Sequence, residues 1–155
     1  MEFSSAAKEK VEKILSRYPE KQAALLPVLH LAQKEFGTVT PEVEKYIADV
    51  LGLPPIRVHG VATFYTMYNK KPVGRHHVQV CTNISCSLLG ADHLMKYIES
   101  KLGVKTGETT PDGRFTLTAV ECLGSCGTAP VMQINDDYYE NLTEQEIDRI
   151  LSGLK

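Results

Sequence analysis

The sequence lacks the features that mark secreted, membrane-spanning and nucleic-acid-binding proteins. Its 17 Lys and Arg residues are outnumbered by 19 Asp and Glu residues, so no basic excess is available to bind a polyanion. The opening stretch MEFSSAAKEKVEK has no apolar signal-peptide core, and nothing approaches the roughly 18 uninterrupted apolar residues of a membrane span. We therefore expect a soluble cytoplasmic protein with no nucleic-acid partner and no direct membrane insertion.

Motifs for independent catalysis are also missing. The chain contains neither a GxGxxG dinucleotide fingerprint nor a phosphate-binding P-loop. No Ser-His-Asp or Cys-His arrangement stands out, and we assign no catalytic residue. The sequence motifs therefore indicate no nucleotide-binding or catalytic site in this chain.

The composition does support a folded core. Of the 155 residues, 43% are hydrophobic and 23% are charged, which suits one ordinary domain or a small domain with a satellite. The pattern changes at the polar stretch NKKPVGRHH. We predict a small all-helical domain over residues 1–72 and an α/β domain over residues 73–155.

Helix signals are frequent in the first part. A helix is predicted to begin at Ser4 or Ser5, and Thr40 followed by Pro41 gives a second clear start. Pro54-Pro55 predicts a further helix that runs to Tyr68. Pro27 either kinks its helix or stands in the first turn.

The second part predicts strands and helices in the order β-α-β-β-β-α. HVQVC and FTLTAVEC are strand-like and end on Cys81 and Cys122, and Thr143 is expected to cap the last helix. This order suits a thioredoxin-like layered α/β fold. In such folds a cis proline often precedes the hairpin, so Ala129-Pro130 is a candidate cis peptide.

Four cysteines form the only strong site signal. The pattern is Cys81-x4-Cys86 and Cys122-x3-Cys126, with 35 residues between the two pairs. Each pair follows a predicted strand end, where sites are commonly built in α/β sheets. If the two strands are neighbours, both loops supply thiolates to one edge.

Four thiolates suit zinc or an iron–sulfur cluster. Zinc is usually held by CxxC turns, and neither pair is one. Longer loops rich in small residues, such as Gly124 and Gly127, give room for backbone N–H groups to point at cluster sulfurs, so we favour a 2Fe-2S cluster. Structural zinc, two disulfides and merely buried thiols remain alternatives.

A family resemblance rests on these motifs. CTNISC (81–86), ECLGSCGTAP (121–130) and VATFYTMYN (61–69), in this order, resemble the E-type subunits of NADH:quinone oxidoreductase, respiratory complex I. The same module occurs in NAD(P)-linked hydrogenases and formate dehydrogenases. LLPVLHLAQKEFG and GLPPIRVHGVATFY resemble its N-terminal helical part, so the resemblance covers nearly the whole chain.

The resemblance implies a thioredoxin-like 2Fe-2S ferredoxin domain behind a helical domain. It implies that Cys81, Cys86, Cys122 and Cys126 ligate one 2Fe-2S cluster that carries single electrons in an NADH-oxidising complex. FMN and NAD(H) would bind to a partner flavoprotein subunit, and a further Fe-S subunit is possible. Such a complex would place this chain at the inner face of the cytoplasmic membrane. A hydrogenase or formate dehydrogenase subunit and a zinc-stabilised interaction module are the alternatives.

Other candidate residues carry weaker signals. His76 and His77 precede the first strand and are interpreted as solvated or supporting groups, because neither cysteine loop contains the histidine of a Rieske site. His30 and His59 are expected in helices and not as ligands. Phe64, Tyr65, Met67 and Tyr68 are expected mainly in the core, with a flavoprotein contact as the alternative.

Overall fold

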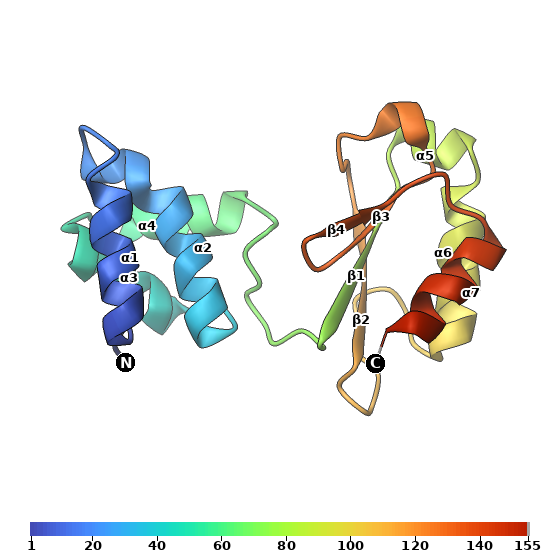
Figure 1. Cartoon of the computed structure of the whole chain (residues 1–155), viewed down its shortest axis with the longest axis horizontal. Helices are drawn as coiled ribbons and strands as arrows, with labels where there is room; N and C mark the ends of the chain where they lie inside the picture. The colour runs from blue at the N-terminus through green and yellow to red at the C-terminus, as the bar shows by residue number, and fades with distance from the viewer. Residues whose placement is uncertain (155) are drawn as a thin grey trace. The chain divides into compact units, whose positions relative to one another are not determined.

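The computed structural model describes residues 1–154. It divides into two compact units, one ending at Pro72 and the other beginning at Val73 (Figure 1). Each unit has its own hydrophobic core. In the described part of the chain, no helix combines the length and apolarity needed to cross a membrane.

The regular elements of the first unit are helices. They are α1 (Ser5–Leu15), the short 3-10 helix η1 (Lys21–Ala24), α2 (Leu25–Phe36), α3 (Pro41–Leu51) and α4 (Pro55–Phe64). The predicted caps are present: Ser4 Oγ accepts from Ala7 N–H at 3.3 Å, and Thr40 Oγ1 accepts from Val43 N–H at 3.4 Å. These bonds satisfy N–H groups that the first turn of a helix leaves without partners.

Two details of the helix prediction are settled by the structure. Pro27 lies in the first turn of α2, where its missing N–H costs nothing, and the helix continues to Phe36. The helix predicted to reach Tyr68 was too long, because α4 ends at Phe64 and Tyr65 turns to an extended conformation.

Tyr68 explains why the chain leaves the helix there. Its side chain is buried, and its hydroxyl donates to the Leu26 carbonyl at 2.9 Å. Burial raises the pKa of Tyr68 to about 12. The buried Tyr68 side chain therefore connects the segment that follows α4 to the start of α2.

The core of the first unit includes residues of α1, α2, α3 and α4 and of the segment before α3. Its largest fully buried side chains are Val28, Leu29, Val39, Val43, Ile47, Leu51 and Val58. Glu44 is the charged exception. Its carboxylate pairs with Lys70 and lies 2.8 Å from His59 Nδ1, so the burial of the charge is compensated. Lys70 is thereby fixed to the first unit.

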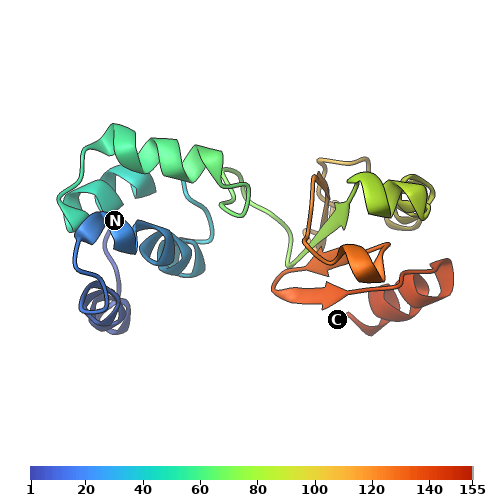
Figure 2. The same ribbon diagram turned by 90° about the horizontal axis from the view of Figure 1, so that it is seen from above.

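The second unit contains a four-stranded mixed sheet. Its elements are β1 (His76–Cys81), α5 (Ile84–Leu88), α6 (Ala91–Leu102), β2 (Phe115–Val120), the 3-10 helix η2 (Cys126–Thr128), β3 (Met132–Ile134), β4 (Asp137–Tyr139) and α7 (Glu144–Gly153). The strand order is β2-β1-β3-β4, with β1 and β2 parallel and the other pairs antiparallel. Figures 1 and 2 both show α6 and α7 on the same side of this sheet.

The central strands are buried against the helices. Val78 and Leu117 of the sheet, Ile98 of α6 and Ile147 of α7 are fully buried in one cluster. Thr143 caps α7 as predicted, because its hydroxyl accepts from Glu146 N–H at 3.2 Å. The predicted thioredoxin-like α/β order is therefore confirmed.

The register of β1 against β2 positions the cysteines. His76 pairs with Phe115 at one end and Cys81 pairs with Val120 at the other. The predicted strand that ended on Cys122 was two residues too long, since β2 ends at Val120. This leaves Cys122 in a loop and free to bend away from the sheet.

Candidate functional site

The first cysteine loop is formed by the end of β1 and the start of α5. Cys81 is the last residue of β1, and Asn83 caps α5 by accepting from Ile84 N–H at 2.7 Å. Cys86 lies in α5. Both thiols are buried, at 3% exposure each. This short helix was missed from the sequence, although Asn83 at its start is a typical capping residue.

The second cysteine loop follows β2. It runs from Glu121 to Pro130 and carries Cys122 and Cys126, which are both exposed. Cys126 begins η2. Exposure makes this loop the part of the candidate site that another molecule can reach.

The two loops meet because their strands are parallel neighbours. Thr82 N–H donates to Val120 O at 2.9 Å, and Cys81 Sγ lies 3.7 Å from Glu121 O. The carboxyl ends of parallel strands meet at one edge of a sheet. The structure thus places both loops at the same edge, as the sequence predicted.

Backbone N–H groups point at the sulfur atoms of both loops. Burial raises the pKa of Cys81, but two backbone N–H groups and the Cys86 thiol act in the opposite direction and leave it below its usual value. These N–H groups belong to Asn83 and Leu123, one from each loop. Such donors stabilise a thiolate and therefore favour metal ligation.

The pKa of Cys86 moves the other way. Burial raises it, and hydrogen bonding to Cys81 raises it further, whereas the N–H of Val131 lowers it. In the exposed loop, Gly124 N–H donates to Cys122 Sγ at 3.3 Å. Gly124 has φ +78°, a conformation that favours glycine.

Small residues surround the buried thiols. Cys81 and Cys86 pack with Ala91, Ala129 and Val131. The Ala129-Pro130 peptide is cis, as predicted. Cys81 N–H donates to Val131 O at 3.1 Å, which ties β1 to the chain just beyond this proline.

Comparison with known proteins decides the family. A family model described as thioredoxin-like [2Fe-2S] ferredoxin matches residues 11–155. This chain belongs to that family. The predicted resemblance is therefore confirmed.

Two relatives place the chain within this ferredoxin family. It is 51% identical over 148 residues to the E-type subunit of NADH-quinone oxidoreductase from Rickettsia conorii, covering 93% of this chain and 88% of the relative. It is 45% identical over 148 residues to an E-type subunit of NADH-quinone oxidoreductase from Rhizobium meliloti, covering 96% and 88%. The ferredoxin thus groups with the E-type subunits, as predicted.

A solved structure supports the fold. The crystal structure of NAD+-reducing [NiFe]-hydrogenase in the air-oxidized state aligns with 84% of this chain and 22% of its own chain, with a TM-score of 0.71 and 22% identity. The ferredoxin therefore spans about a fifth of that hydrogenase chain. At this identity the likeness concerns the fold alone.

The cysteines suit the cluster that the family implies. Within residues 1–154, no three His, Cys, Asp or Glu side chains converge as ligands of a single metal ion do. Each loop supplies two free thiols, and a 2Fe-2S cluster requires two thiolates for each iron. The N–H groups directed at the sulfurs match the hydrogen bonding that such clusters receive.

The histidines lie elsewhere. His76 and His77 begin β1, at the end opposite Cys81, and His77 Nε2 is 2.8 Å from Thr118 Oγ1. Burial lowers the pKa of His77. His30 packs on Tyr68, and His59 pairs with Glu44. His30 and His59 therefore belong to the first unit, and His76 and His77 lie at the end of β1 away from Cys81.

The aromatic stretch after α4 divides into two parts. Tyr68 is in the core as expected, but the core prediction was wrong for Phe64, Tyr65 and Met67. Phe64 is 77% exposed, and the other two are also exposed. The end of α4 at Phe64 causes this difference, because the chain turns before it reaches Tyr68.

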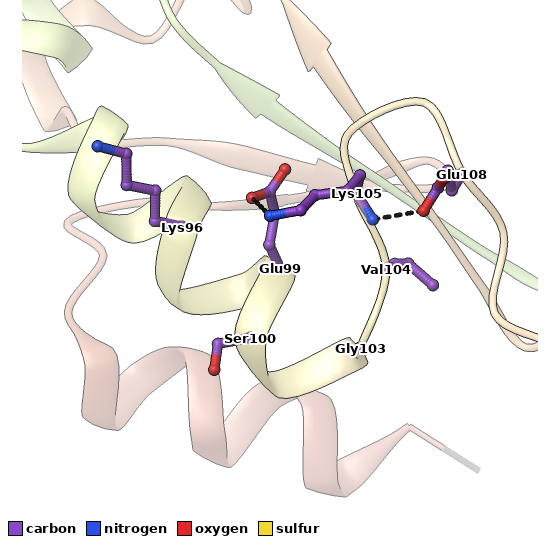
Figure 3. A pocket seen from close by; sticks show the side chains of 7 residues that line it. All are labelled: Lys96, Glu99, Ser100, Gly103, Val104, Lys105 and Glu108. Carbon is purple, nitrogen blue, oxygen red and sulfur yellow. Dashed lines mark hydrogen bonds and ion pairs between the residues drawn. The ribbon is translucent and has the colours of Figure 1, made fainter.

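A groove at the other end of α6 is not part of the site. It is lined by Lys96, Glu99, Ser100, Gly103, Val104, Lys105 and Glu108 (Figure 3). Lys105 Nζ pairs with Glu99 at 3.2 Å, and Lys105 N–H donates to Glu108 at 2.7 Å. The groove therefore holds one ion pair, and no cysteine lines it.

Proposed function

We propose that this ferredoxin is the 2Fe-2S electron-transfer subunit of an NADH-quinone oxidoreductase. Cys81, Cys86, Cys122 and Cys126 would ligate one cluster. A bound 2Fe-2S cluster takes up and releases one electron at a time. The chain would thus exchange single electrons with the FMN of a partner subunit, and its own residues bind no substrate.

One observation carries this proposal: two loops, each with two free cysteines, lie at one edge of the sheet. The buried pair, Cys81 and Cys86, is held by regular structure on both sides. The exposed pair, Cys122 and Cys126, lies where an electron can enter or leave. Backbone N–H groups at both loops would stabilise the thiolates and tune the reduction potential.

The cofactors that handle NADH belong to a partner in this proposal. The sequence has no dinucleotide-binding motif, so FMN and NAD(H) would be held by a flavoprotein subunit. A further Fe-S subunit would be a neighbour. The assembly would place this chain on the inner face of the cytoplasmic membrane as a peripheral subunit.

Exposed apolar side chains beside the first loop support a flavoprotein contact. Ile84, Leu88 and Leu89 are all exposed, and Leu88 is 82% exposed in the same short helix as Cys86. Large apolar side chains gathered at a surface are typical of interfaces. Phe64 and Tyr65 form a second such group on the first unit.

Absorption spectroscopy of the chain purified without oxygen tests the cluster. Thiolate-to-iron charge transfer colours a 2Fe-2S protein, whereas d10 zinc gives no such bands. We expect a red-brown protein that dithionite bleaches, with equal iron and sulfide contents. A colourless folded chain with stoichiometric zinc would instead support the zinc-stabilised interaction module.

Serine variants test the ligands. Cys122→Ser and Cys126→Ser change exposed side chains, so loss of colour in a folded variant reports on ligation and not on the core. Cys81→Ser and Cys86→Ser also bury a hydroxyl and are the less direct test. Ser152→Ala on α7 serves as a control that leaves the colour unchanged.

Reconstitution with a flavoprotein tests the electron donor. NADH should reduce the cluster only when the FMN-binding partner is present, and Leu88→Asp should weaken that partner's binding while the cluster stays loaded. Genes for membrane subunits beside this one would favour the quinone-linked complex. Their absence, with hydrogenase or formate dehydrogenase genes in their place, would favour a soluble complex.

A further inference from the structure

Three polar side chains join the exposed cysteine loop to the segment that follows β4. Ser125 stands immediately before Cys126, Thr128 ends η2, and Glu140 follows β4. The Glu140 Oε1 atom accepts hydrogen bonds from Ser125 Oγ and, at 2.7 Å, from Thr128 Oγ1. The two hydroxyl oxygens are 2.8 Å apart. One carboxylate oxygen thus holds two points of the loop.

The residues around Glu140 hold the same loop at further points. Tyr138 Oη donates to the Leu123 carbonyl at 3.0 Å, and Asn141 N–H donates to the Thr128 carbonyl at 2.7 Å. Residues 138–141, which we name the strap, therefore contact the loop between its cysteines and just after them. Apart from the short helix η2, no helix or strand contains this loop, so the hydrogen bonds from the strap restrain it.

We propose that Glu140 is a positioning residue for the cluster: its carboxylate fixes the second cysteine loop through Ser125 and Thr128, and its charge keeps the reduction potential low. The inference rests on the proposed function, because it requires a cluster on Cys122 and Cys126. Glu140 has hydrogen bonds to Ser125 and Thr128 and none to either cysteine, so it acts through the two hydroxyls.

The charge of Glu140 predicts the sign of its effect. A glutamate carboxylate is ionised at neutral pH, and reduction adds a further negative charge to the cluster. Like charges repel, so a nearby carboxylate favours the oxidised state and lowers the potential. The hydrogen bonds add a second effect: they occupy the Ser125 hydroxyl, which is then not free to donate to a sulfur atom and raise the potential.

Two variants separate the charge from the restraint. Glu140→Gln removes the charge and keeps an acceptor oxygen of similar reach for both hydroxyls. Glu140→Ala removes the charge and the acceptor together. Asp112→Asn is the matched control, because Asp112 also accepts from a threonine hydroxyl, that of Thr110, but lies before β2 at the opposite end of the strand.

The experiment is a potentiometric titration of the loaded full chain, followed by visible absorption and electron paramagnetic resonance. We expect an upward shift of the potential in Glu140→Gln and Glu140→Ala and none in Asp112→Asn. Loss of the cluster to an iron chelator should be about 2- to 10-fold faster in Glu140→Ala, as expected for one or two lost hydrogen bonds. Glu140→Gln should lose it at nearly the wild-type rate.

The outcomes separate this inference from the function that it builds on. A wild-type chain without a 2Fe-2S cluster would overturn the proposed function and this inference together. If the wild type holds the cluster and both Glu140 variants have the same reduction potential as the wild type, this inference alone is overturned. If Glu140→Ala does not fold, the potential of Glu140→Gln still decides.

Discussion

Gly124 offers the sharpest test of how the exposed loop is built. Its φ of +78° lies in the left-handed region, where an L side chain crowds its own backbone. Its N–H donates to Cys122 Sγ at 3.3 Å. A Cβ added at this position would meet nothing within 4 Å, so Gly124→Ala perturbs the backbone conformation and nothing else.

The magnitude follows from the conformation. Holding alanine in the left-handed region costs roughly 1–2 kcal/mol. If opening of the loop relieves this strain, the population of the open loop rises about 5- to 30-fold. A loop that relaxes instead turns the Gly124 N–H away from Cys122 and leaves the thiolate less stabilised. Both responses accelerate loss of the cluster.

The assay compares cluster loss to an iron chelator in Gly124→Ala and Gly127→Ala. Gly127 lies in the same loop, its φ is not in the left-handed region, and an added Cβ would also meet nothing within 4 Å. Gly127→Ala should therefore lose the cluster at the wild-type rate or slightly more slowly, because alanine has less conformational freedom than glycine in the unfolded chain. Equal rates for the two variants would refute the argument from backbone strain.

Three further predictions concern the stability of the two units. Gly74→Ala should destabilise the second unit by about 1–3 kcal/mol in urea unfolding, because its Cβ would lie 2.9 Å from the backbone carbons of Arg114 and Phe115; a change below about 0.5 kcal/mol would contradict this. The raised pKa of Tyr68 favours the neutral phenol in the fold, so stability should be complete below pH 10.0 and fall as the pH rises toward about 12, and this alkaline loss should shrink in Tyr68→Phe when both are unfolded at several pH values. Limited proteolysis should cut first within residues 70–74 and release fragments that match the proposed domains 1–72 and 73–155; a first cut inside either unit would argue against that division.

The sequence was a good guide wherever the signal was local. Thr40 and Pro41 mark a helix start through their own backbone and side-chain preferences, and the structure has that helix. The cysteine loops were located because each follows a β-rich run. Their approach to one another needed one further assumption, that the two strands are parallel neighbours, and the register confirms it.

Prediction was weaker where distant contacts decide the conformation. The helix predicted from Pro54-Pro55 ran to Tyr68, but Tyr68 bonds to Leu26, and α4 ends at Phe64. The short helix α5 has one capping residue and too few residues for a periodic pattern. Glu140 carries no local signal at all, since its partners lie on the other side of a hairpin.

The contrast between the two cysteine loops connects the fold to the proposed function. Cys81 and Cys86 are buried between a strand end and a helix, so their positions follow from the core. Cys122 and Cys126 are exposed, and their loop depends on Gly124 and on the strap that includes Glu140. A cluster held in this way is anchored on one side and open on the other. Electron exchange with a partner needs the open side, whereas retention of the cluster needs the restraint, and the hydrogen bonds behind the exposed loop supply that restraint without covering the thiols.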